Sequence, residues 1–540
     1  MNIIIPSAKI VPEELQSLGK LPAVIYPVNQ KIVFEYLQDC YKNASFTVVC
    51  YENADKVHRR LTKYENTKII DLDQLGDLGY TVWYGIKDLT GACVINFADT
   101  IVENQTENNS DDVFYYAEDE ISDTWTFFKE QNGVITGIVD KKKRNESKDR
   151  QGKLFVGVFH FSHVEYLAEC LKKALQIPNP EMSSFYYALQ LYSQKYALTP
   201  IKTDKWFDIG HADKYYNAQL EVKAREFNHI KIDKQRGILT KSSDDVDKFI
   251  GEIKWYLKLP ADIEYVRPRI FDYSISYNKP YVSMEYYAYH TVHEMFLYGD
   301  LNRSQWINIF KRILFVCRDL QRYTVRDDDI KQALEDMYLH KTIQRFDRLQ
   351  SDERFAEFFS KAITVNGVKY KPLNGVIKVL HETIPAMLYD VDQFHIIHGD
   401  MCFANIMVDN NFNFIKLIDP RGRFGKYDIY GDQRYELAKL FHSVDGKYDF
   451  IIKDLFNLDY NLDRAVINYR INDRVRDYDL YELFLEVFKD EIGDDLKKVE
   501  LIEALLFLSM IPLHGESLKH QLTMLGTGLD ILNRVVNITA

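Results

Sequence analysis

The sequence predicts a two-domain protein, in which an α/β domain with a mostly parallel sheet (residues 1–222) precedes an α+β domain (residues 226–540). The chain has 540 residues, well above the roughly 250–300 at which a single core stops growing. Short apolar runs alternate with amphipathic stretches through the first 220 residues, whereas the pattern after residue 300 is mainly helical. Because no Pro/Gly-rich linker separates the two parts, we expect them to pack against each other.

In the N-terminal domain, apolar runs of strand length alternate with helix-like stretches. The helix-like stretches include residues 30–42 and 162–175. Strands that alternate with helices favour a mostly parallel sheet covered on both faces. The strand-like runs are "NIIIPS", "FTVVCY", "TKIIDL", "GACVINFAD" and "LFVGVFHF".

The C-terminal domain begins with a different pattern. The segment "FNHIKIDKQRGILTKSS" predicts a β-hairpin with Gly237 at its turn, and a periodic helix is expected at 244–258. These elements belong to a small β-rich lobe of about residues 226–290. A large helical lobe, about 291–540, follows, and we expect it to be interrupted by a pair of strands around 395–418.

Composition and charge argue against several classes of protein. Hydrophobic residues make up 46% of the chain, which is enough for packed cores. The net charge of −12, from 68 Lys and Arg against 80 Asp and Glu, argues against a general binder of nucleic acid. Six scattered cysteines without a CxxC pair indicate a reducing compartment. With no signal-peptide pattern and no apolar run near ~20 residues, we expect a cytoplasmic protein without membrane insertion, and homo-oligomerisation stays open.

The stretch "FHIIHGDMCFANIMVDNN" carries polar residues at fixed spacings in an apolar context. His398-Gly-Asp400 is followed by Asn405, and the strand-like "FIKLI" leads to Asp419 fourteen residues after that Asn. Phosphoryl transfer needs one carboxylate near the attacking hydroxyl and oxygen ligands that fix Mg²⁺ on the phosphates. The motif supplies such a set. The alternative is a polar turn with a buried His and structural Asp and Asn caps.

These residues resemble the catalytic loop of the protein-kinase-like fold, in the branch of aminoglycoside phosphotransferases and choline kinases. That branch carries H-G-D-x-x-x-x-N followed by I-D. The resemblance implies a catalytic motif in which Asp400 is the base or hydroxyl-orienting group and His398 braces the loop. It also implies that Asn405 and Asp419 bind Mg²⁺, and that the cofactors are ATP and Mg²⁺.

The same resemblance predicts nucleotide-binding parts upstream. "GILTKSSDDVDKFIGEIKWYL" offers Lys241 on a strand and Glu252 on the next helix as the expected ion pair. The segment around Met284 to Tyr286 resembles the hinge whose backbone binds an adenine ring. By themselves, a Lys and a Glu eleven residues apart are more often surface charges.

The chain also departs from the family pattern. No GxGxxG loop and no APE segment occur, which argues against a protein kinase. "IDPRGRFGKYDIYGDQRYELAKL" replaces DFG, and Arg421 and Arg423 either clamp a phosphate or anionic substrate or pair with nearby Asp residues. Asp432 and Glu436 are expected to anchor the loop. His514 and Glu516 are candidates for the acceptor pocket, with a hydrogen-bonded core His as the alternative for His514.

The N-terminal domain resembles sugar-1-phosphate nucleotidyltransferases. The resemblance implies metal-binding Asp residues at Asp99 and Asp208, and a second nucleoside triphosphate (CTP, UTP, GTP or dTTP). The family's G-x-G-T-R loop is replaced by "SAKIVPEELQSLGK", and its catalytic Lys falls on Ala23, with Lys20 the nearest substitute. The stretches that carry the resemblance are "LGKLPAVIYPVNQKIVFEYL", "GACVINFADTIV", "LFVGVFHFS" and "KWFDIGHADKYYNAQ".

Together these features predict a bifunctional enzyme that makes a precursor of a surface polysaccharide, in capsule or lipopolysaccharide synthesis. The C-terminal domain would phosphorylate a hydroxyl of a sugar, polyol or amino alcohol, and the N-terminal domain would transfer a nucleotidyl group to a sugar- or alcohol-phosphate. Its partners would be the small-molecule acceptor and nucleotide, and not nucleic acid. Two alternatives stay open, namely an active kinase with a non-catalytic N-terminal domain and an inactive scaffold.

Overall fold

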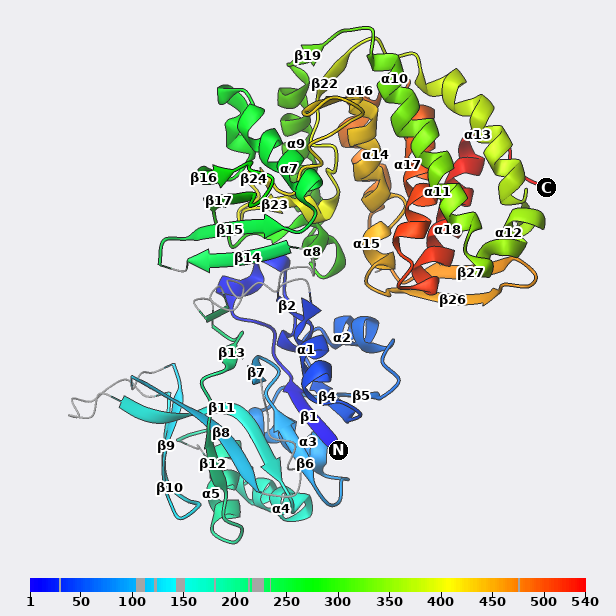
Figure 1. The fold of residues 1–540 in the computed structure, drawn as a ribbon. Helices are drawn as coiled ribbons and strands as arrows, with labels where there is room; N and C mark the ends of the chain where they lie inside the picture. The colour runs from blue at the N-terminus through cyan, green and yellow to red at the C-terminus, as the bar shows by residue number, and fades with distance from the viewer. Residues whose placement is uncertain are drawn as a thin grey trace. The chain divides into compact units, whose positions relative to one another are not determined.

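The chain forms two compact units in a computed structural model (Figure 1). Unit 1 comprises Met1–Val222 with Tyr298–Asp300, and unit 2 comprises Lys223–Leu297 with Leu301–Ala540. The predicted domain boundary at 222–226 lies outside the described residues. The described residues are 1–28, 31–102, 112–120, 124–141, 151–178, 181–211, 214–215, 228–233, 235–473 and 476–540.

Unit 1 alternates strands and helices. Two 3₁₀ helices, Glu13–Leu18 and Ala23–Ile25, lie where the sequence departs from the nucleotide-loop pattern. Its helices are α1 (Val33–Cys40), α2 (Ala54–Leu61), α3 (Leu78–Ile86), α4 (Val164–Ala174) and α5 (Ser184–Ser193). Its strands are β1 (Asn2–Ser7), β2 (Pro27–Val28), β3 (Lys31–Ile32), β4 (Ser45–Cys50), β5 (Thr67–Asp71), β6 (Cys93–Asn96), β7 (Thr100–Val102), β8 (Val113–Glu120), β9 (Thr126–Gln131), β10 (Val134–Asp140), β11 (Gln151–Phe161), β12 (Thr199–Lys202) and β13 (Trp206–Asp208).

The described part of unit 1 contains a nine-stranded mixed sheet. Its main order is β10-β9-β11-β6-β1-β4-β5, and β8 pairs with β11 and β12. The α/β class is confirmed, and the expected parallel pairing holds where helices separate the strands, from β6 through β1 and β4 to β5. Strand β11 instead pairs antiparallel with β6, β8 and β9, and β9 with β10. The β9–β10 hairpin returns the chain through a short turn without a crossover helix, which makes that pair antiparallel.

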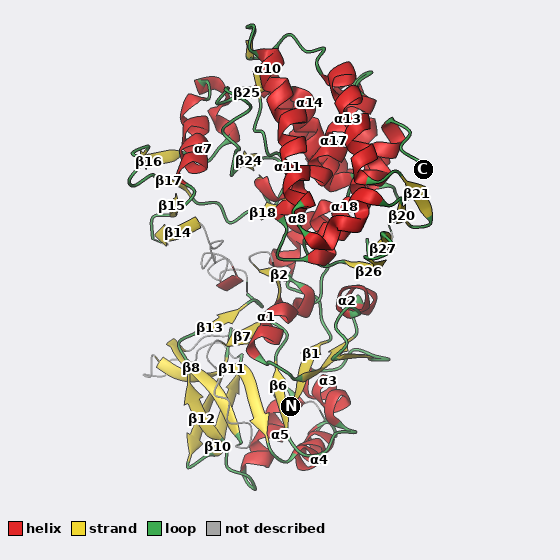
Figure 2. Cartoon of the chain, turned by 45° about the vertical axis from the view of Figure 1, so that its right-hand side comes forward, coloured by secondary structure: helices red, strands yellow, loops and turns green. Residues whose placement is uncertain are grey.

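Helices α3, α4 and α5 cover one face of this sheet (Figure 2). The core between them contains Val82 and Leu189 from the helices, and Ile4 and Phe159 from β1 and β11. All four side chains are fully buried. Burial of such apolar residues stabilises the unit by roughly 1.5–3 kcal/mol for each side chain.

Unit 2 begins with a four-stranded antiparallel sheet of order β14-β15-β17-β16. The predicted hairpin is confirmed as β14 (Asn228–Asp233) and β15 (Ile238–Ser243), with Gly237 at a φ of 64° in the turn. The predicted helix is confirmed as α7 (Val246–Lys258). Asp245 caps it by accepting a hydrogen bond from the Lys248 amide. The other two strands are β16 (Ile270–Ser274) and β17 (Tyr281–Glu285).

The rest of unit 2 is mainly helical, as expected. Helix α17 packs against both α14 and α18. The helices are α8 (Val292–Leu297), α9 (Arg303–Gln321), α10 (Ile330–Leu334), α11 (Lys341–Gln350), α12 (Ala356–Ser360), α13 (Leu373–Leu388), α14 (Gln433–Val444), α15 (Tyr448–Ile451), α16 (Leu480–Ile492), α17 (Leu496–Met510) and α18 (Leu518–Val535). A π-helical turn, Glu335–His340, joins α10 to α11, and 3₁₀ turns span Ala261–Val266, Glu353–Phe355, Phe403–Asn405 and Ile511–Leu513.

Strands interrupt the helical part in more places than predicted. The expected strand pair around 395–418 is confirmed as the antiparallel β23 (Ile406–Val408) and β24 (Ile415–Leu417). A sheet of order β21-β20-β27-β26 was not predicted. Its β20–β21 hairpin turns through Asn366-Gly367, both with positive φ, which is a strong hairpin signal in the sequence. The further strands are β18 (His290–Thr291), β19 (Thr324–Val325), β20 (Ile363–Val365), β21 (Val368–Tyr370), β22 (Phe394–Ile396), β25 (Tyr430–Gly431), β26 (Phe456–Asn461) and β27 (Val466–Ile471).

None of the helices in the described ranges has the length and apolar character that a membrane span requires.

Candidate functional site

Lys241 lies at the centre of a buried ion cluster in unit 2. Its Nζ is 2.8 and 2.9 Å from the two carboxylate oxygens of Glu252 and 2.7 Å from Oδ1 of Asp419. The side chains of Lys241 and Glu252 are only 5% and 9% exposed. Although burial lowers it, the two carboxylates raise the pKa of Lys241 above its ordinary value, so the ammonium stays charged. The structure therefore brings together three of the predicted site residues.

Helix α7 holds this cluster against the Asp419 loop by one face. Glu252, Trp255 and Tyr256 follow each other at helical spacing, so their side chains lie side by side. Trp255 Nε1 donates to the Ile397 carbonyl at 2.7 Å, and the Asp419 amide donates to the Tyr256 hydroxyl at 3.1 Å. Asp419 has a φ of 55°, an uncommon conformation for a residue other than glycine. Strained backbone of this kind persists only where surrounding contacts hold it.

Asp400 forms the second part of the site with Asn405 and Lys439. Lys439 Nζ is 2.8 Å from Oδ1 of Asp400, and Asn405 Nδ2 donates to the Asp400 carbonyl at 2.8 Å and to its Oδ2 at 3.2 Å. Burial opposes ionisation of Asp400, but the Lys439 ammonium holds the pKa of that carboxyl well below its usual range. Asp400 is therefore a carboxylate at neutral pH.

The β23–β24 hairpin places Asn405 and Asp419 at the same end of two paired strands. Asn405 directly precedes β23, and Asp419 follows β24 by two residues. Ile406 is opposite Leu417, and the Ile418 amide donates to the Asn405 carbonyl at 3.0 Å. Because Asn405 uses its Nδ2 on Asp400, its Oδ1 is the atom that it could give to a metal. An amide oxygen and a carboxylate are ligands that Mg²⁺ accepts.

His398 is a buried part of the loop and holds it in place. Its Nε2 is 2.9 Å from the Ile418 carbonyl, and its ring lies edge-on to Trp255. Burial lowers the pKa of His398 to about 4, so the ring is neutral and Nε2 carries the proton that it donates. Glu436 accepts hydrogen bonds from the His398 and Gly399 amides. The bracing contacts expected of His398 and Glu436 are therefore present.

Lys439 was not predicted as a site residue, although the spacing of polar residues along α14 indicates a buried polar face. Asp432, Tyr435, Glu436 and Lys439 recur at spacings of three and four residues along this helix and its N-cap. That spacing puts polar groups on one buried face. Asp432 caps the helix and binds Arg434 and the Tyr338 hydroxyl, as its predicted anchoring role requires. Buried polar side chains need hydrogen-bond or ionic partners, and the Asp400 loop provides them for Glu436 and Lys439.

The two arginines after Asp419 have different surroundings. Arg421 Nη1 donates to the Tyr435 hydroxyl at 2.8 Å, and its amide donates to the His398 carbonyl at 3.0 Å. Arg423 is exposed, and its Nε donates to the Gly425 carbonyl. Within the described residues, neither guanidinium forms an ion pair with an Asp. The expected alternative of a structural Asp partner is therefore not what holds Arg421.

The predicted hinge lies on β17. Met284 is 5% exposed and pairs with Leu239 and Ile270 across the sheet. The Tyr286 amide donates to the Gly237 carbonyl at 2.9 Å, so it extends the pairing of β17 with β15 by one residue. While that bond holds, the Tyr286 amide is not available to the adenine ring that the sequence predicts there.

In unit 1, the two predicted metal-binding Asp residues converge. A Cβ added to Gly210 would lie 2.7 Å from Oδ2 of Asp99 and 3.1 Å from Oδ1 of Asp208. Burial and the Asp208 carboxylate raise the pKa of Asp99 to about 6. Asp208 also pairs with His211 Nδ1 at 2.5 Å. Two close carboxylates whose ionisation is opposed are the donor set that a divalent cation stabilises.

Lys20 is not brought to these carboxylates by any contact among the described residues. It is exposed, and its carbonyl accepts hydrogen bonds from Asn53 Nδ2 and Lys56 Nζ.

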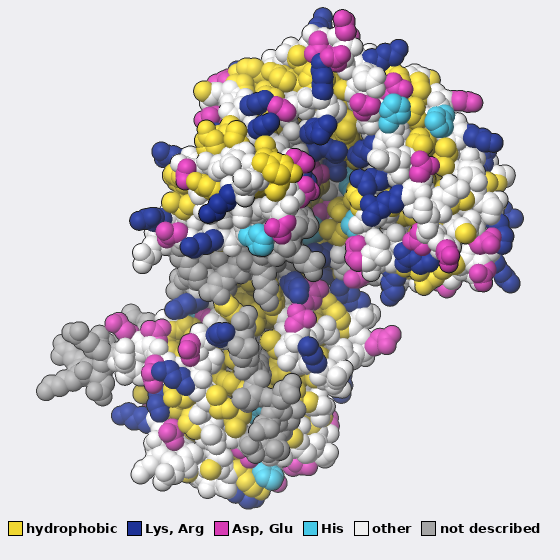
Figure 3. All heavy atoms as spheres, in the orientation of Figure 1, with side chains coloured by type: hydrophobic (Ala, Val, Ile, Leu, Met, Phe, Trp, Pro, Cys, Tyr) yellow, Lys and Arg dark blue, Asp and Glu magenta, His cyan; other side chains and the backbone are white. Residues whose placement is uncertain are grey.

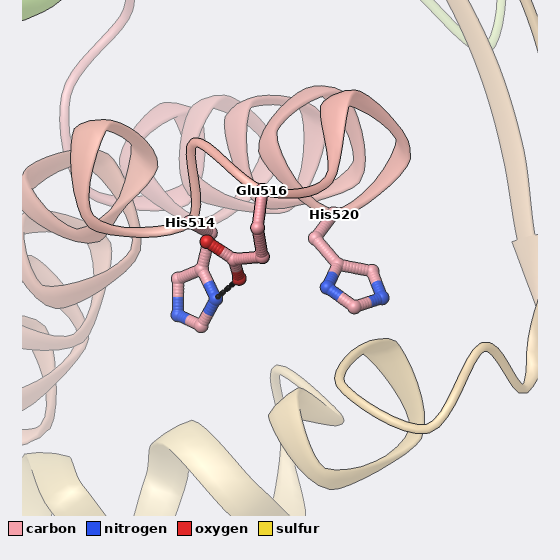
Figure 4. Close-up of side chains that lie close together, drawn as sticks. All are labelled: His514, Glu516 and His520. Carbon is pink, nitrogen blue, oxygen red and sulfur yellow. Dashed lines mark hydrogen bonds and ion pairs between the residues drawn. The ribbon is translucent and has the colours of Figure 1, made fainter. Parts of the chain in front are cut away.

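His514, Glu516 and His520 lie close together in the loop that leads into α18 and in the first turn of that helix (Figure 4). His514 Nδ1 is 3.1 Å from Oε1 of Glu516, and His520 Nε2 is 3.0 Å from Oδ1 of Asp454. The His514 side chain is hydrogen-bonded, as the alternative of a core histidine expects, but it is 17% exposed and so not fully buried.

No protein-family model matches the chain, and no curated protein matches it. Solved structures are similar to its N-terminal part. A nucleoside-diphosphate-sugar pyrophosphorylase from Vibrio cholerae RC9 is 16% identical, covering 40% of this chain and 99% of its own, with a TM-score of 0.33. CTP:phosphocholine cytidylyltransferase (LicC) from Streptococcus pneumoniae is 14% identical, covering 40% and 96%, with a TM-score of 0.33. The inositol-1-phosphate CTP transferase from T. maritima is 12% identical, covering 41% and 97%, with a TM-score of 0.32. Similarities this low assign no activity to the chain.

Replacing Gly422 with Ala is expected to destabilise unit 2. Gly422 has a φ of 65°, and an added Cβ would lie 2.2 Å from the Gly251 carbonyl, next to Glu252 on α7. The strained backbone and the clash together should lower the free energy of unfolding by about 1–3 kcal/mol. Differential scanning calorimetry of the full chain should show a transition lowered by several degrees. Gly515→Ala is the control, since nothing lies within 4 Å of its added Cβ. Equal transitions for both variants would contradict the assigned close approach.

Proposed function

We propose that unit 2 is an ATP-dependent phosphotransferase of the aminoglycoside phosphotransferase and choline kinase type, acting on a hydroxyl of a small molecule. The observation that supports it best is the ion cluster of Lys241, Glu252 and Asp419, in which a strand and the helix that follows it meet a loop 178 residues further along the chain. In a kinase-like fold, this Lys binds the phosphates and this Glu positions it. Asp400 and Asn405 stand beside the cluster on the loop that precedes β23.

In the proposed reaction, the acceptor hydroxyl attacks the γ-phosphorus of ATP. A bond forms from the acceptor oxygen to phosphorus, the bond from phosphorus to the β–γ bridging oxygen breaks, and ADP leaves with that electron pair. The hydroxyl proton passes to the Asp400 carboxylate. Mg²⁺, held by Asn405 Oδ1 and the Asp419 carboxylate, would neutralise charge on the phosphates.

Lys439 sets how Asp400 takes part. Because Lys439 lowers the pKa of Asp400, this carboxylate is a weak base that orients the hydroxyl and receives its proton late. Such a role suits phosphoryl transfer, whose loose transition state needs positioning more than early proton removal.

A small-molecule acceptor is favoured over a protein. The hairpin β14–β15 has a single glycine, Gly237, in place of a glycine-rich loop, and no APE segment follows Asp419. These are the departures that separate the small-molecule branch from protein kinases in the sequence.

For unit 1, we propose nucleotidyl transfer from CTP, UTP, GTP or dTTP to a sugar- or alcohol-phosphate. The convergence of Asp99 and Asp208 at Gly210 favours it, because two carboxylates can hold one Mg²⁺ against a triphosphate. The exposed Lys20 is the nearest candidate for the phosphate-binding lysine. A kinase product is a phosphate, which a nucleotidyltransferase consumes, so the two activities fit one cytoplasmic route to a capsule or lipopolysaccharide precursor.

Asp400→Asn is expected to reduce phosphotransfer by about 10²–10⁴-fold in kcat, because the hydroxyl loses its carboxylate partner. ATP consumption should be measured over sugars, polyols and amino alcohols with Mg²⁺. The matched control is Asp392→Asn, an exposed Asp two residues before β22. If wild-type protein shows neither acceptor-dependent turnover nor binding of MgATP, the proposed phosphotransfer fails.

Asp99→Asn and Asp208→Asn are each expected to abolish pyrophosphate release from a nucleoside triphosphate and the phosphorylated product. Each removes one of the two charges that would hold the cation. The control is Asp88→Asn, at an exposed position. Wild-type levels of pyrophosphate release from either Asp99 or Asp208 variant would refute the assignment. If the wild-type chain releases none while unit 2 is active, unit 1 is a binding domain.

A further inference from the structure

Cationic side chains from two helices and the Asp419 loop gather around Tyr435. Lys341 Nζ and Arg421 Cζ each lie 5.8 Å from the centre of the Tyr435 ring. Lys439 follows Tyr435 by one turn of α14, and Arg345 follows Lys341 by one turn of α11. Figure 3 shows unit 2 hollowed between its strand-rich and helical parts, with Lys and Arg side chains along the helical side of the hollow.

These cations have few counter-charges. Within the described residues, Asp400 is the carboxylate that pairs with the group, through Lys439. Lys341, Arg345 and Arg421 form no ion pair there, and the buried Nε of Arg345 has no hydrogen-bond partner. Half-buried guanidinium and ammonium groups need anions or acceptors to offset their lost hydration.

The groups also act on one another. Burial, and then the Arg421, Lys439 and Arg345 charges, lower the pKa of Lys341 to about 8. Despite burial, Arg421, Lys341 and Lys439 lower the pKa of the Tyr435 hydroxyl to about 8. An anion placed among these side chains would relieve their mutual repulsion.

We propose that Lys341, Arg345 and Arg421 bind a phosphate or carboxylate group of the acceptor molecule, the one whose hydroxyl proton passes to Asp400. This inference rests on the proposed phosphotransfer of unit 2. It excludes choline and other cationic acceptors, for which a carboxylate and aromatic cage would be required. The γ-phosphate of ATP has the same chemistry, but Lys341 and Arg345 come from α11, whereas Lys241 and Glu252 of the proposed nucleotide side come from β15 and α7.

Sulfate is a suitable probe because its charge is constant near neutral pH. Titration of the full chain with sulfate, with Mg²⁺ and the non-hydrolysable ATP analogue AMP-PNP present, should give a dissociation constant at least 10-fold weaker in Lys341→Gln and in Arg345→Gln. Lys378→Gln, an exposed Lys on α13, is the control and should bind like wild type. Wild-type binding by both cluster variants would overturn the site. Sulfate binding with ADP that is lost with AMP-PNP would assign the cluster to the γ-phosphate instead.

Acceptor pairs that differ by one anionic group test the substrate class. Glycerol 3-phosphate against glycerol, and gluconate against glucose, should show a KM at least 10-fold lower for the anionic member, and Lys341→Gln should remove that difference while the KM for ATP changes little. A preference for choline or ethanolamine would overturn the proposal. If sulfate binds as expected but no acceptor supports turnover, the anion site stands and the phosphotransfer fails.

A second inference comes independently from the loop between α17 and α18. One ligand atom from each of His514, Glu516 and His520 lies within 4.8 Å of the others. His520 Nε2 is hydrogen-bonded to Oδ1 of Asp454. Figure 4 shows the other ring nitrogen of His520 turned toward Glu516. A carboxylate that accepts from one imidazole nitrogen and leaves the other free to ligate is the usual outer contact of a metal-bound His.

We infer that His514, Glu516 and His520 bind a divalent transition metal of the Zn²⁺ class, which would clamp this loop to the start of α18. Two imidazoles and one carboxylate are the donor set that Zn²⁺ accepts.

Zn²⁺ titration of the chelator-treated full chain, in competition with a chromogenic chelator, tests this site. Wild type should bind one more Zn²⁺ per chain than Glu516→Gln or His520→Ala, and Asp454→Asn should weaken that site by about 10–100-fold. His381→Ala, an exposed His on α13, is the control. Glu516→Gln alters an exposed side chain, so its folding should be unaffected. Equal stoichiometry and affinity in all variants would overturn the inference.

Discussion

The ammonium of Lys241 is the constraint on which the site in unit 2 depends. Removing a charged amine from water is costly unless oxygen partners replace its hydration. Three carboxylate oxygens do so here, two from Glu252 and one from Asp419. Because these partners belong to α7 and to the loop after β24, the strand β15 that carries Lys241 is tied to both. Displacing any of these segments would leave a buried charge without its partner.

Helix α14 holds the Asp400 loop in a similar way, through side chains that contact the loop. Glu436 receives backbone amides at the start of the loop, and Lys439 reaches the Asp400 carboxylate one turn later. Burial raises the pKa of Glu436 to about 7, although amide donors oppose the shift, so these hydrogen bonds are worth most when its carboxylate is ionised. The residues at the start of the loop are thus held by charge-assisted contacts. Tyr435, directly before Glu436 on α14, extends the polar stripe to Arg421.

The sequence predicted the parts of unit 2 whose chemistry depends on local spacing. Lys241, Glu252, Asp400, Asn405 and Asp419 all lie on the elements expected for them, because the hairpin turn, the helix cap and the short strands are encoded by nearby residues. Lys439 and the cations of α11 were not foreseen. Their importance depends on which helices pack together, and a Lys on a helix has no local feature that distinguishes a buried ion partner from a solvated one.

The same distinction applies to the strands. Of β8 to β11, the sequence predicted only β11, as part of a mostly parallel sheet, because its apolar run resembles those of the parallel strands before it and composition does not set the direction of pairing. β20 and β21 are only three residues each, below the length at which periodicity separates strand from helix. The Asn-Gly turn between them was the available signal. Turn chemistry is therefore more informative than apolar content for the short strands of this chain.

The balance of charge around Asp400 links the proposed chemistry of the site to its proposed specificity. The Asp400 carboxylate faces Lys439 and Arg421, whose charges hold the pKa of that carboxyl low. In the proposed phosphotransfer, this field would keep Asp400 ionised and weaken it as a base, so that catalysis would depend more on positioning. A cationic acceptor would add to the repulsion among these groups, whereas an anionic one would be held by them. In the proposed reaction, the groups that lower the pKa of Asp400 would therefore also select the charge of the acceptor.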